Sequence, residues 1–116
     1  MISEREFQVI VGYRVRLVRA MEGESQARFA KRLRVGDTAV SNYESGVRPI
    51  DSFQALLLKQ QLAVPLEWLY AGEEGNLTPA FKEKLARAIE AVEAERDNPR
   101  KRGRPKAPAK KVRKVA

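Results

Sequence analysis

The 116-residue chain contains no cysteine and no histidine. The lack of cysteine excludes a disulfide framework, a thiolate nucleophile and a zinc finger. The lack of histidine excludes Ser-His-Asp chemistry and the usual transition-metal ligand. The sequence also has no Walker-type phosphate loop. We therefore expect a protein that is not an enzyme and that binds no metal and no cofactor.

Long apolar runs are missing too, and none exceeds four residues, as at 55–58. A membrane-spanning helix needs roughly 20 apolar residues. Glu4, Arg5 and Glu6 stand where a signal peptide would need an apolar stretch. We therefore expect a soluble cytoplasmic protein without a membrane segment.

The positive charge is concentrated at one end of the chain. The net charge is +8, and residues 97–116 hold nine Lys or Arg and a single acid, Asp97. Residues 1–96 hold 14 basic and 14 acidic side chains and are therefore neutral overall. A neutral globule with a cationic tail predicts a polyanionic partner, nucleic acid first and an anionic membrane surface second.

Apolar residues recur at three- and four-residue steps, and strand-like alternation is absent, which predicts an all-α fold. Ser3 and Glu6 have the spacing of a capping box. The expected helices cover 4–21, 26–33 and 37–44, a stretch capped by Asp51, a stretch from Pro65 to the residue before Gly72, and a stretch from 79 to about 97. In the fourth helix we assign Phe53, Leu56, Leu57 and Leu62 to the core.

The second and third helices are short and only about three residues apart, at 34–36. Ala30 in the first of them and Val40 in the second suit a helix-turn-helix, because a small side chain lets the two helices cross closely. The second helix of this motif can lie in the DNA major groove with its N-terminal residues against the bases.

Residues 11–72 carry a longer pattern that includes this motif. It consists of Gly12-x-Arg14-Val15-Arg16-x-x-Arg19, Ser25-Gln26-x-x-Phe29-Ala30-x-x-Leu33, Val40-Ser41-x-Tyr43-Glu44-x-Gly46, and Pro65-Leu66-Glu67-Trp68-Leu69 with Gly72. The pattern resembles the phage-repressor and Cro-like (XRE-type) helix-turn-helix regulators. The resemblance implies a compact five-helix domain at 1–72 and a sequence-specific DNA-binding transcriptional regulator that acts as a repressor.

The resemblance also implies roles for individual residues. Gln26 matches a residue that contacts a phosphate and braces the recognition helix, and Arg48 matches a contact to the DNA backbone. Arg19 and Glu44 match a partly buried salt bridge between the first and third helices. The outward positions of the recognition helix are Asp37, Thr38, Ser41 and Asn42.

These polar residues have simpler readings as well. Thr38, Ser41 and Asn42 could form only a solvated face, although the motif favours DNA contact for Thr38 and Asn42. Asp37 is either a reader of a cytosine amino group or a favourable charge at the helix N-terminus, and we prefer the second reading. Arg28, Lys31 and Arg32 could serve solubility alone, but their place beside the groove favours phosphate contact.

The link between the two helices departs from the family pattern. Arg34 stands where glycine is usual, and a non-glycine residue at positive φ costs roughly 1 kcal/mol. Gly36 stands where a capping Ser or Thr is common. Both departures bear on the orientation of the recognition helix.

The tail at 98–116 is rich in Pro, Lys and Arg and is expected to be disordered in isolation. The stretch Lys101-Arg102-Gly103-Arg104-Pro105-Lys106 resembles an AT-hook, whose Arg-Gly-Arg-Pro core binds the narrow minor groove of A·T-rich DNA. The alternative is a plain polycation. Double-stranded DNA is the expected partner in both cases, and the nucleoid is the expected location.

The last helix, at 79–97, carries one apolar stripe formed by Phe81, Leu85, Ile89 and Val92. The stripe either folds back on the core or pairs with a second copy. We favour pairing into a homodimer, since one recognition helix makes few base contacts and a two-fold dimer would read half-sites about 34 Å apart.

Two other functions stay open at this point. One is an antitoxin-like or anti-regulator module that keeps the fold but binds a protein. The other is RNA binding through the tail.

Overall fold

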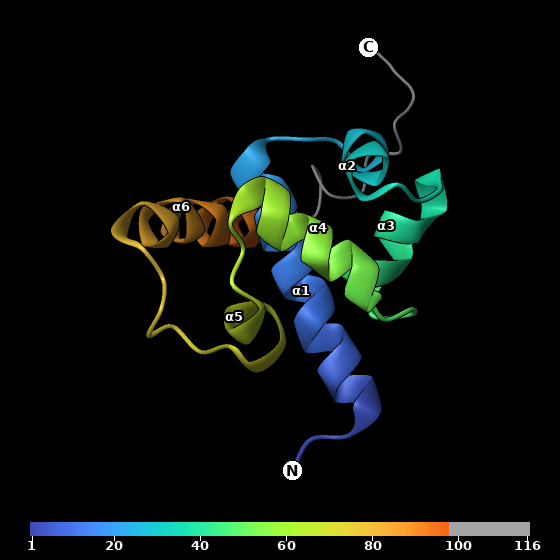
Figure 1. Cartoon of the computed structure of the whole chain (residues 1–116), viewed down its shortest axis with the longest axis horizontal. Helices are drawn as coiled ribbons and strands as arrows, with labels where there is room; N and C mark the ends of the chain where they lie inside the picture. Colours follow the sequence, from blue (N-terminus) through green and yellow to red (C-terminus); the bar gives the residue numbers. More distant parts are fainter. Residues whose placement is uncertain (98–116) are drawn as a thin grey trace.

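The computed structural model describes residues 1–97, which form six α-helices and no strand (Figure 1). The helices are α1 (Glu4–Glu22), α2 (Gln26–Leu33), α3 (Asp37–Ser45), α4 (Ser52–Leu62), α5 (Leu66–Ala71) and α6 (Pro79–Arg96). The predicted all-α class is confirmed, and the first three helices end within a residue or so of their predicted bounds. The basic tail at 98–116, including its AT-hook-like stretch, lies outside the described residues.

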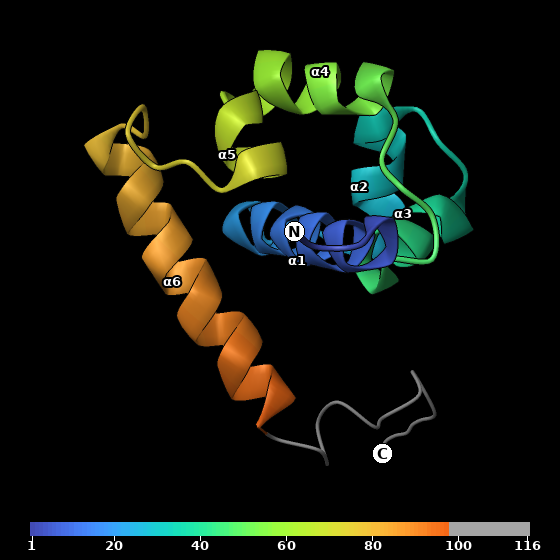
Figure 2. The same cartoon turned by 90° about the horizontal axis from the view of Figure 1, so that it is seen from below.

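Helix α1 runs through the middle of the molecule, and α3, α5 and α6 pack against it (Figures 1 and 2). Its start is fixed by the predicted capping box, in which the Glu6 amide donates to Ser3 Oγ and the Ser3 amide donates to the Glu6 carboxylate, at 3.1 and 2.8 Å. Gly23 ends the helix in the left-handed conformation, φ 63°. The first predicted helix therefore forms as its end signals indicate.

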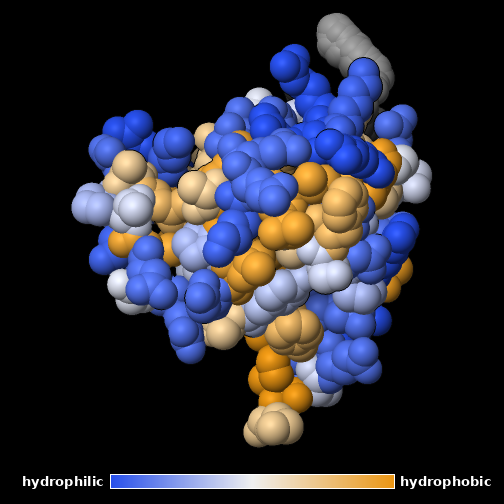
Figure 3. Space-filling view, viewed as in Figure 1, coloured by the Kyte–Doolittle hydropathy of each residue, from blue (hydrophilic) through white to orange (hydrophobic). Residues whose placement is uncertain are grey.

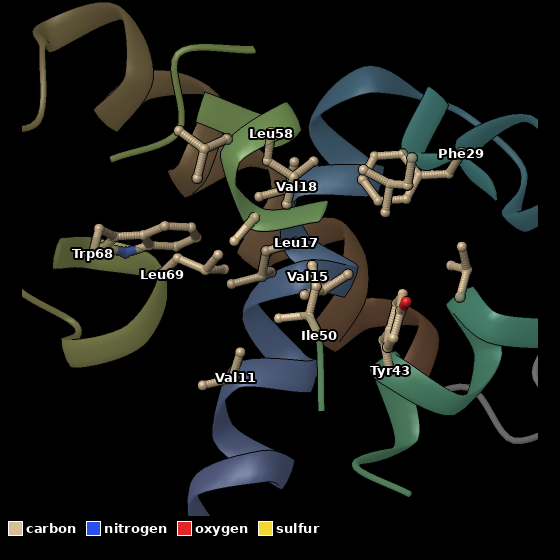
Figure 4. Packing of buried hydrophobic residues seen from close by; sticks show 14 of the residues in the cluster. Val11, Val15, Leu17, Val18, Phe29, Tyr43, Ile50, Leu58, Trp68 and Leu69 are labelled. Carbon is tan, nitrogen blue, oxygen red and sulfur yellow. The ribbon is translucent and has the colours of Figure 1, made fainter. Parts of the chain in front are cut away.

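The hydrophobic core lies around α1 (Figure 4). Val15 and Val18 of α1 are buried between side chains from α2 to α5. The largest of these partners are Phe29, Leu33, Tyr43, Leu58, Trp68 and Leu69. Since each helix contributes one apolar face to the same core, burial rather than helix propensity holds the short helices α2, α3 and α5.

Helices α1 and α3 touch through their backbones. A Cβ atom built on Gly12 would overlap the Tyr43 carbonyl oxygen and would lie 3.0 Å from the Glu44 carbonyl oxygen. At the end of α3, Gly46 has φ 80°, and a Cβ there would lie 2.8 Å from Val9 Cγ2. Glycine is required at Gly12 for space and at Gly46 for both space and conformation.

The core face of α4 differs from the prediction. Phe53 and Leu56 are 49% and 41% exposed, whereas Leu57 and the unpredicted Leu58 are buried. Four consecutive apolar residues, 55–58, leave the periodicity ambiguous, so the inward face is decided by tertiary packing. The buried Gln54 supports the observed face, because its Nε2 donates to the Leu33 carbonyl at 3.4 Å.

Two predicted helix starts also differ in detail. Asp51 occupies the N-cap position of α4, but its side chain makes no capping hydrogen bond and lies 3.7 Å from the Arg48 guanidinium. Pro65 is the N-cap residue of α5 rather than its first helical residue. Thr78 caps α6 as the Thr-Pro pair predicts, since its Oγ1 accepts from the Phe81 amide at 3.1 Å.

Helix α6 crosses α1 and folds back on the core, which is the alternative that we did not favour. Phe81, Leu85 and Val92 are buried in the same core as α1 to α5, and Ile89 is half-buried. The Trp68 and Phe81 rings meet edge to face with centroids 5.3 Å apart. The prediction that this stripe pairs with a second copy is wrong for the chain as folded, because α1 and α5 already supply its apolar partner.

Within residues 1–97, no helix is both long and apolar enough to cross a membrane.

Candidate DNA-binding interface

Helices α2 and α3 are joined by Arg34, Val35 and Gly36, the predicted three-residue link. Arg34 has φ 60°, as the position requires of its occupant, and its amide donates to the Lys31 carbonyl at 3.2 Å. Gly36 is the N-cap residue of α3 and supplies no side-chain cap. Ala30 is fully buried where α2 lies against α3, which is the reason for its small size.

The predicted Arg19–Glu44 salt bridge is present and joins α1 to α3. Arg19 Nε and Nη2 donate to the two Glu44 carboxylate oxygens at 2.6 and 3.0 Å. The Glu44 side chain is only 7% exposed and that of Arg19 22%. Arg19 Nη1 also donates to the Glu24 carbonyl at 2.9 Å, so the guanidinium is held at both ends. A bidentate pair in this setting fixes orientation as well as distance.

Gln26 joins the same network from the first turn of α2. Its Nε2 donates to Glu44 Oε1 at 3.2 Å. Helices α1, α2 and α3 are therefore tied at one point by Arg19, Glu44 and Gln26, which we call the Glu44 network. Gln26 thus touches the recognition helix, and its contact to a phosphate stays a prediction.

The outward face of α3 is a continuous polar stripe. Asp37, Thr38 and Ser41 are exposed and Asn42 is half-buried. Residues at i, i+1, i+4 and i+5 share one side of a helix, so these four side chains lie together. The opposite side is buried through Ala39, Val40 and Tyr43. The stripe is therefore available to a partner, while the Glu44 network fixes the helix that carries it.

Exposed cations flank this stripe. Arg28 and Lys31 are exposed on α2. Arg48 is half-exposed after α3, and its guanidinium carbon lies 5.6 Å from the Tyr43 ring centroid. Exposed positive side chains therefore both precede and follow α3 along the chain.

Arg32 does not belong with these cations. Its guanidinium donates to both carboxylate oxygens of Glu24 and, at 3.1 Å, to Gln61 of α4. The hydrogen bond from Arg32 holds the pKa of Glu24 below its ordinary value. Arg32 therefore fastens α2 to its neighbours, and its contact to a phosphate stays a prediction. Sequence reasoning missed Glu24, because its partners are set by the turn after Gly23.

Residues 15–69 match the family model described as helix-turn-helix. The searches of curated proteins and of solved structures found no significant match.

The fold and the match together define a helix-turn-helix DNA-binding protein. Residues 15–69 belong to its Cro-like (XRE) family, so the predicted family is confirmed, and the chain is a DNA-binding helix-turn-helix regulator. The matched range lies inside the stretch 11–72 that carries the sequence pattern.

Proposed function

We propose that α3 reads base edges in the DNA major groove and that the protein represses transcription by occupying its operator. The observation that carries this proposal is the polar stripe of α3, which faces outward while the Glu44 network fixes the helix behind it. Thr38 and Asn42 are the proposed readers. Ser41 lies between them and is accessible to the same groove.

The backbone contacts are assigned to residues around α3. Gln26, Arg28, Lys31 and Arg48 contact phosphates on the two flanks of the groove. Asp37 is repelled by phosphates, and its carboxylate instead stabilises the N-terminus of α3, where Gly36 offers no capping side chain.

We further propose that the protein binds DNA as a homodimer in the cytoplasm, associated with the nucleoid. A recognition helix of nine residues contacts few bases, and a two-fold pair doubles that number. The stripe of α6 is not the interface, since it is buried within the chain. The basic tail adds minor-groove or non-specific affinity through Arg102, Gly103, Arg104, Pro105 and Lys106, on the basis of sequence alone.

Footprinting and gel shifts on genomic fragments, including the promoter of the protein's own gene, test this proposal. Asn42→Ala and Thr38→Ala should each lose roughly 1–3 kcal/mol on the protected site and much less on random DNA. Gln26→Ala should weaken both kinds of binding alike. Lys82→Ala, on the exposed side of α6, is the matched control. A wild-type chain that protects no discrete site would contradict the proposal.

A second candidate function is protein binding on the same fold. Val9 and Ile10 are exposed at a groove of about 480 Å³ between α1 and α6, which Tyr13, Leu17 and Ile89 also line. A groove of this kind, apolar in part and lined also by charged residues such as Glu74 and Glu93, suits a protein partner. DNA binding without any sequence preference, together with a stable complex with another protein, would favour this function over the first.

A further inference from the structure

Two residues are unusual for their positions, one in its backbone conformation and the other in its exposure to solvent. Arg34 occupies the left-handed region at φ 60°, where its Cβ is strained and glycine would be free of strain. Phe53 is a large apolar residue on α4 that is 49% exposed. The conformation of Arg34 lowers stability, and strained residues that persist are concentrated at functional sites.

The structure brings these two residues together. The Arg34 guanidinium carbon lies 6.0 Å from the Phe53 ring centroid, at the range of a cation–π contact. No salt bridge within residues 1–97 engages Arg34. The ring therefore lies at the outer limit of cation–π range from the guanidinium, and the N–H donors of Arg34 stay available to an acceptor.

The position of Arg34 in the chain indicates what kind of acceptor its N–H donors would meet. Only Val35 and Gly36 separate it from α3, and the link lies at the same edge of the molecule as α3 (Figure 2). Exposed Lys31 precedes it by one helical turn. Figure 3 shows some apolar side chains at the surface over α4, and Phe53 and Leu56 of this helix are exposed.

We propose that Arg34 is a phosphate contact of the DNA-binding surface and that Phe53 is its positioning residue. The proposal rests on the DNA-binding function proposed above and adds a contact that replaces the usual glycine of the link. A glycine at this position would relieve the strain but would leave the phosphate without its donor. The strain is thus retained for binding rather than for folding.

The decisive variant is Arg34→Gly, assayed as the full chain on a random-sequence duplex of about 30 base pairs, because a phosphate contact is independent of sequence. We expect affinity to fall about tenfold and the log–log salt slope to fall by about 0.9. The thermal midpoint should stay unchanged or rise.

The chain offers two matched controls. Ala63→Gly relieves the other strained non-glycine residue, at φ 58°, after α4, and should leave DNA affinity unchanged. Arg87→Gln removes an exposed cation from α6 and measures the effect of net charge alone. If Arg34→Gly weakens binding no more than Arg87→Gln, the assignment of Arg34 is wrong. If it lowers both affinity and the thermal midpoint, Arg34 acts through the fold, and the assignment is wrong as well.

Phe53→Leu tests the positioning role, since it keeps an apolar side chain and removes the aromatic face. It should weaken binding severalfold in the wild-type chain and have no effect in Arg34→Gly. Equal losses in both backgrounds would overturn the role of Phe53 and assign it to another contact. A wild-type chain that binds no DNA at all would contradict the proposed function itself, which distinguishes that failure from the failure of the Arg34 assignment.

Discussion

Helix α1 makes two long contacts, and they are built differently. Against α3 it approaches backbone to backbone at Gly12, and the neighbouring Arg19–Glu44 pair is largely withdrawn from water. Against α6 it buries an apolar stripe, and its polar contacts lie at the surface. Tyr13 Oη donates to Glu93 at 3.4 Å, and Arg16 pairs with Glu95.

The difference shows what each contact specifies. A backbone approach and a buried bidentate pair tolerate almost no displacement, so the position of the recognition helix is fixed. An apolar stripe with surface ion pairs rewards burial but accepts small shifts of the helix. The contact that positions α3 is therefore the stricter one, and the contact with α6 contributes stability.

The largest expected effect on stability concerns the contact between α1 and α3. Gly12→Ala introduces a methyl group where the Tyr43 carbonyl oxygen lies, so α1 and α3 must move apart. We expect a loss of more than about 3 kcal/mol of unfolding free energy in thermal or urea denaturation. Gly75→Ala is the control, because nothing lies within 4 Å of its added Cβ. Similar stabilities for the two variants would refute the close approach.

Glu44→Ala comes next. It leaves the Arg19 guanidinium largely desolvated without its carboxylate, and removes the acceptor of Gln26. We expect a loss of about 3 kcal/mol in the same denaturation assay, near the lower end for a broken buried pair. Glu83→Ala breaks the exposed Glu83–Arg87 pair of α6 and should cost less than about 0.5 kcal/mol. A melt unchanged by Glu44→Ala would remove the salt bridge from the account of this fold.

The stability of the contact between α1 and α6 should depend on how well its apolar residues are packed rather than on its charged residues. Leu85→Ala should cost about 2–3 kcal/mol, because Leu85 is buried, while Ile89→Ala should cost less than about 1 kcal/mol, since Ile89 is half-buried. Both are measured by denaturation. Sedimentation of Leu85→Ala should give the wild-type mass. A change of mass without a loss of stability would restore the idea that the stripe joins two copies.

Much of this architecture is predictable, and the exceptions have physical causes. The capping box at Ser3 and Glu6 predicts the start of α1, and the spacing of the helix-turn-helix residues identifies the site. The resemblance also implied the Arg19–Glu44 pair that the structure contains. Rules of helix capping and residue spacing predict the structure correctly where a few neighbouring residues determine it.

The errors concern contacts between distant segments. Periodicity shows that α6 has an apolar stripe but not that Trp68 and α1 provide its partner. The inward face of α4 is hidden by its apolar run, and the meeting of Arg34 with Phe53 depends on that face. Arg32 looks like a free cation in the sequence, because its partner Gln61 lies on another helix. These features are set by tertiary packing, which overrides local patterns.

The smallest expected effect returns to the surface of the α6 contact. The Arg16 and Glu95 side chains are 26% and 43% exposed, so water and salt screen their attraction, and ordering two long side chains offsets part of the gain. Glu95→Ala should therefore cost less than about 1 kcal/mol in low salt, and this cost should shrink toward zero at 1 M salt. The cost of Glu44→Ala should change little over the same range, because a buried pair is screened less. Parallel denaturation of both variants in low and high salt measures the contrast. A salt-independent cost for Glu95→Ala would mean that Glu95 acts through packing, and the two contacts of α1 would then be more alike than their geometry indicates.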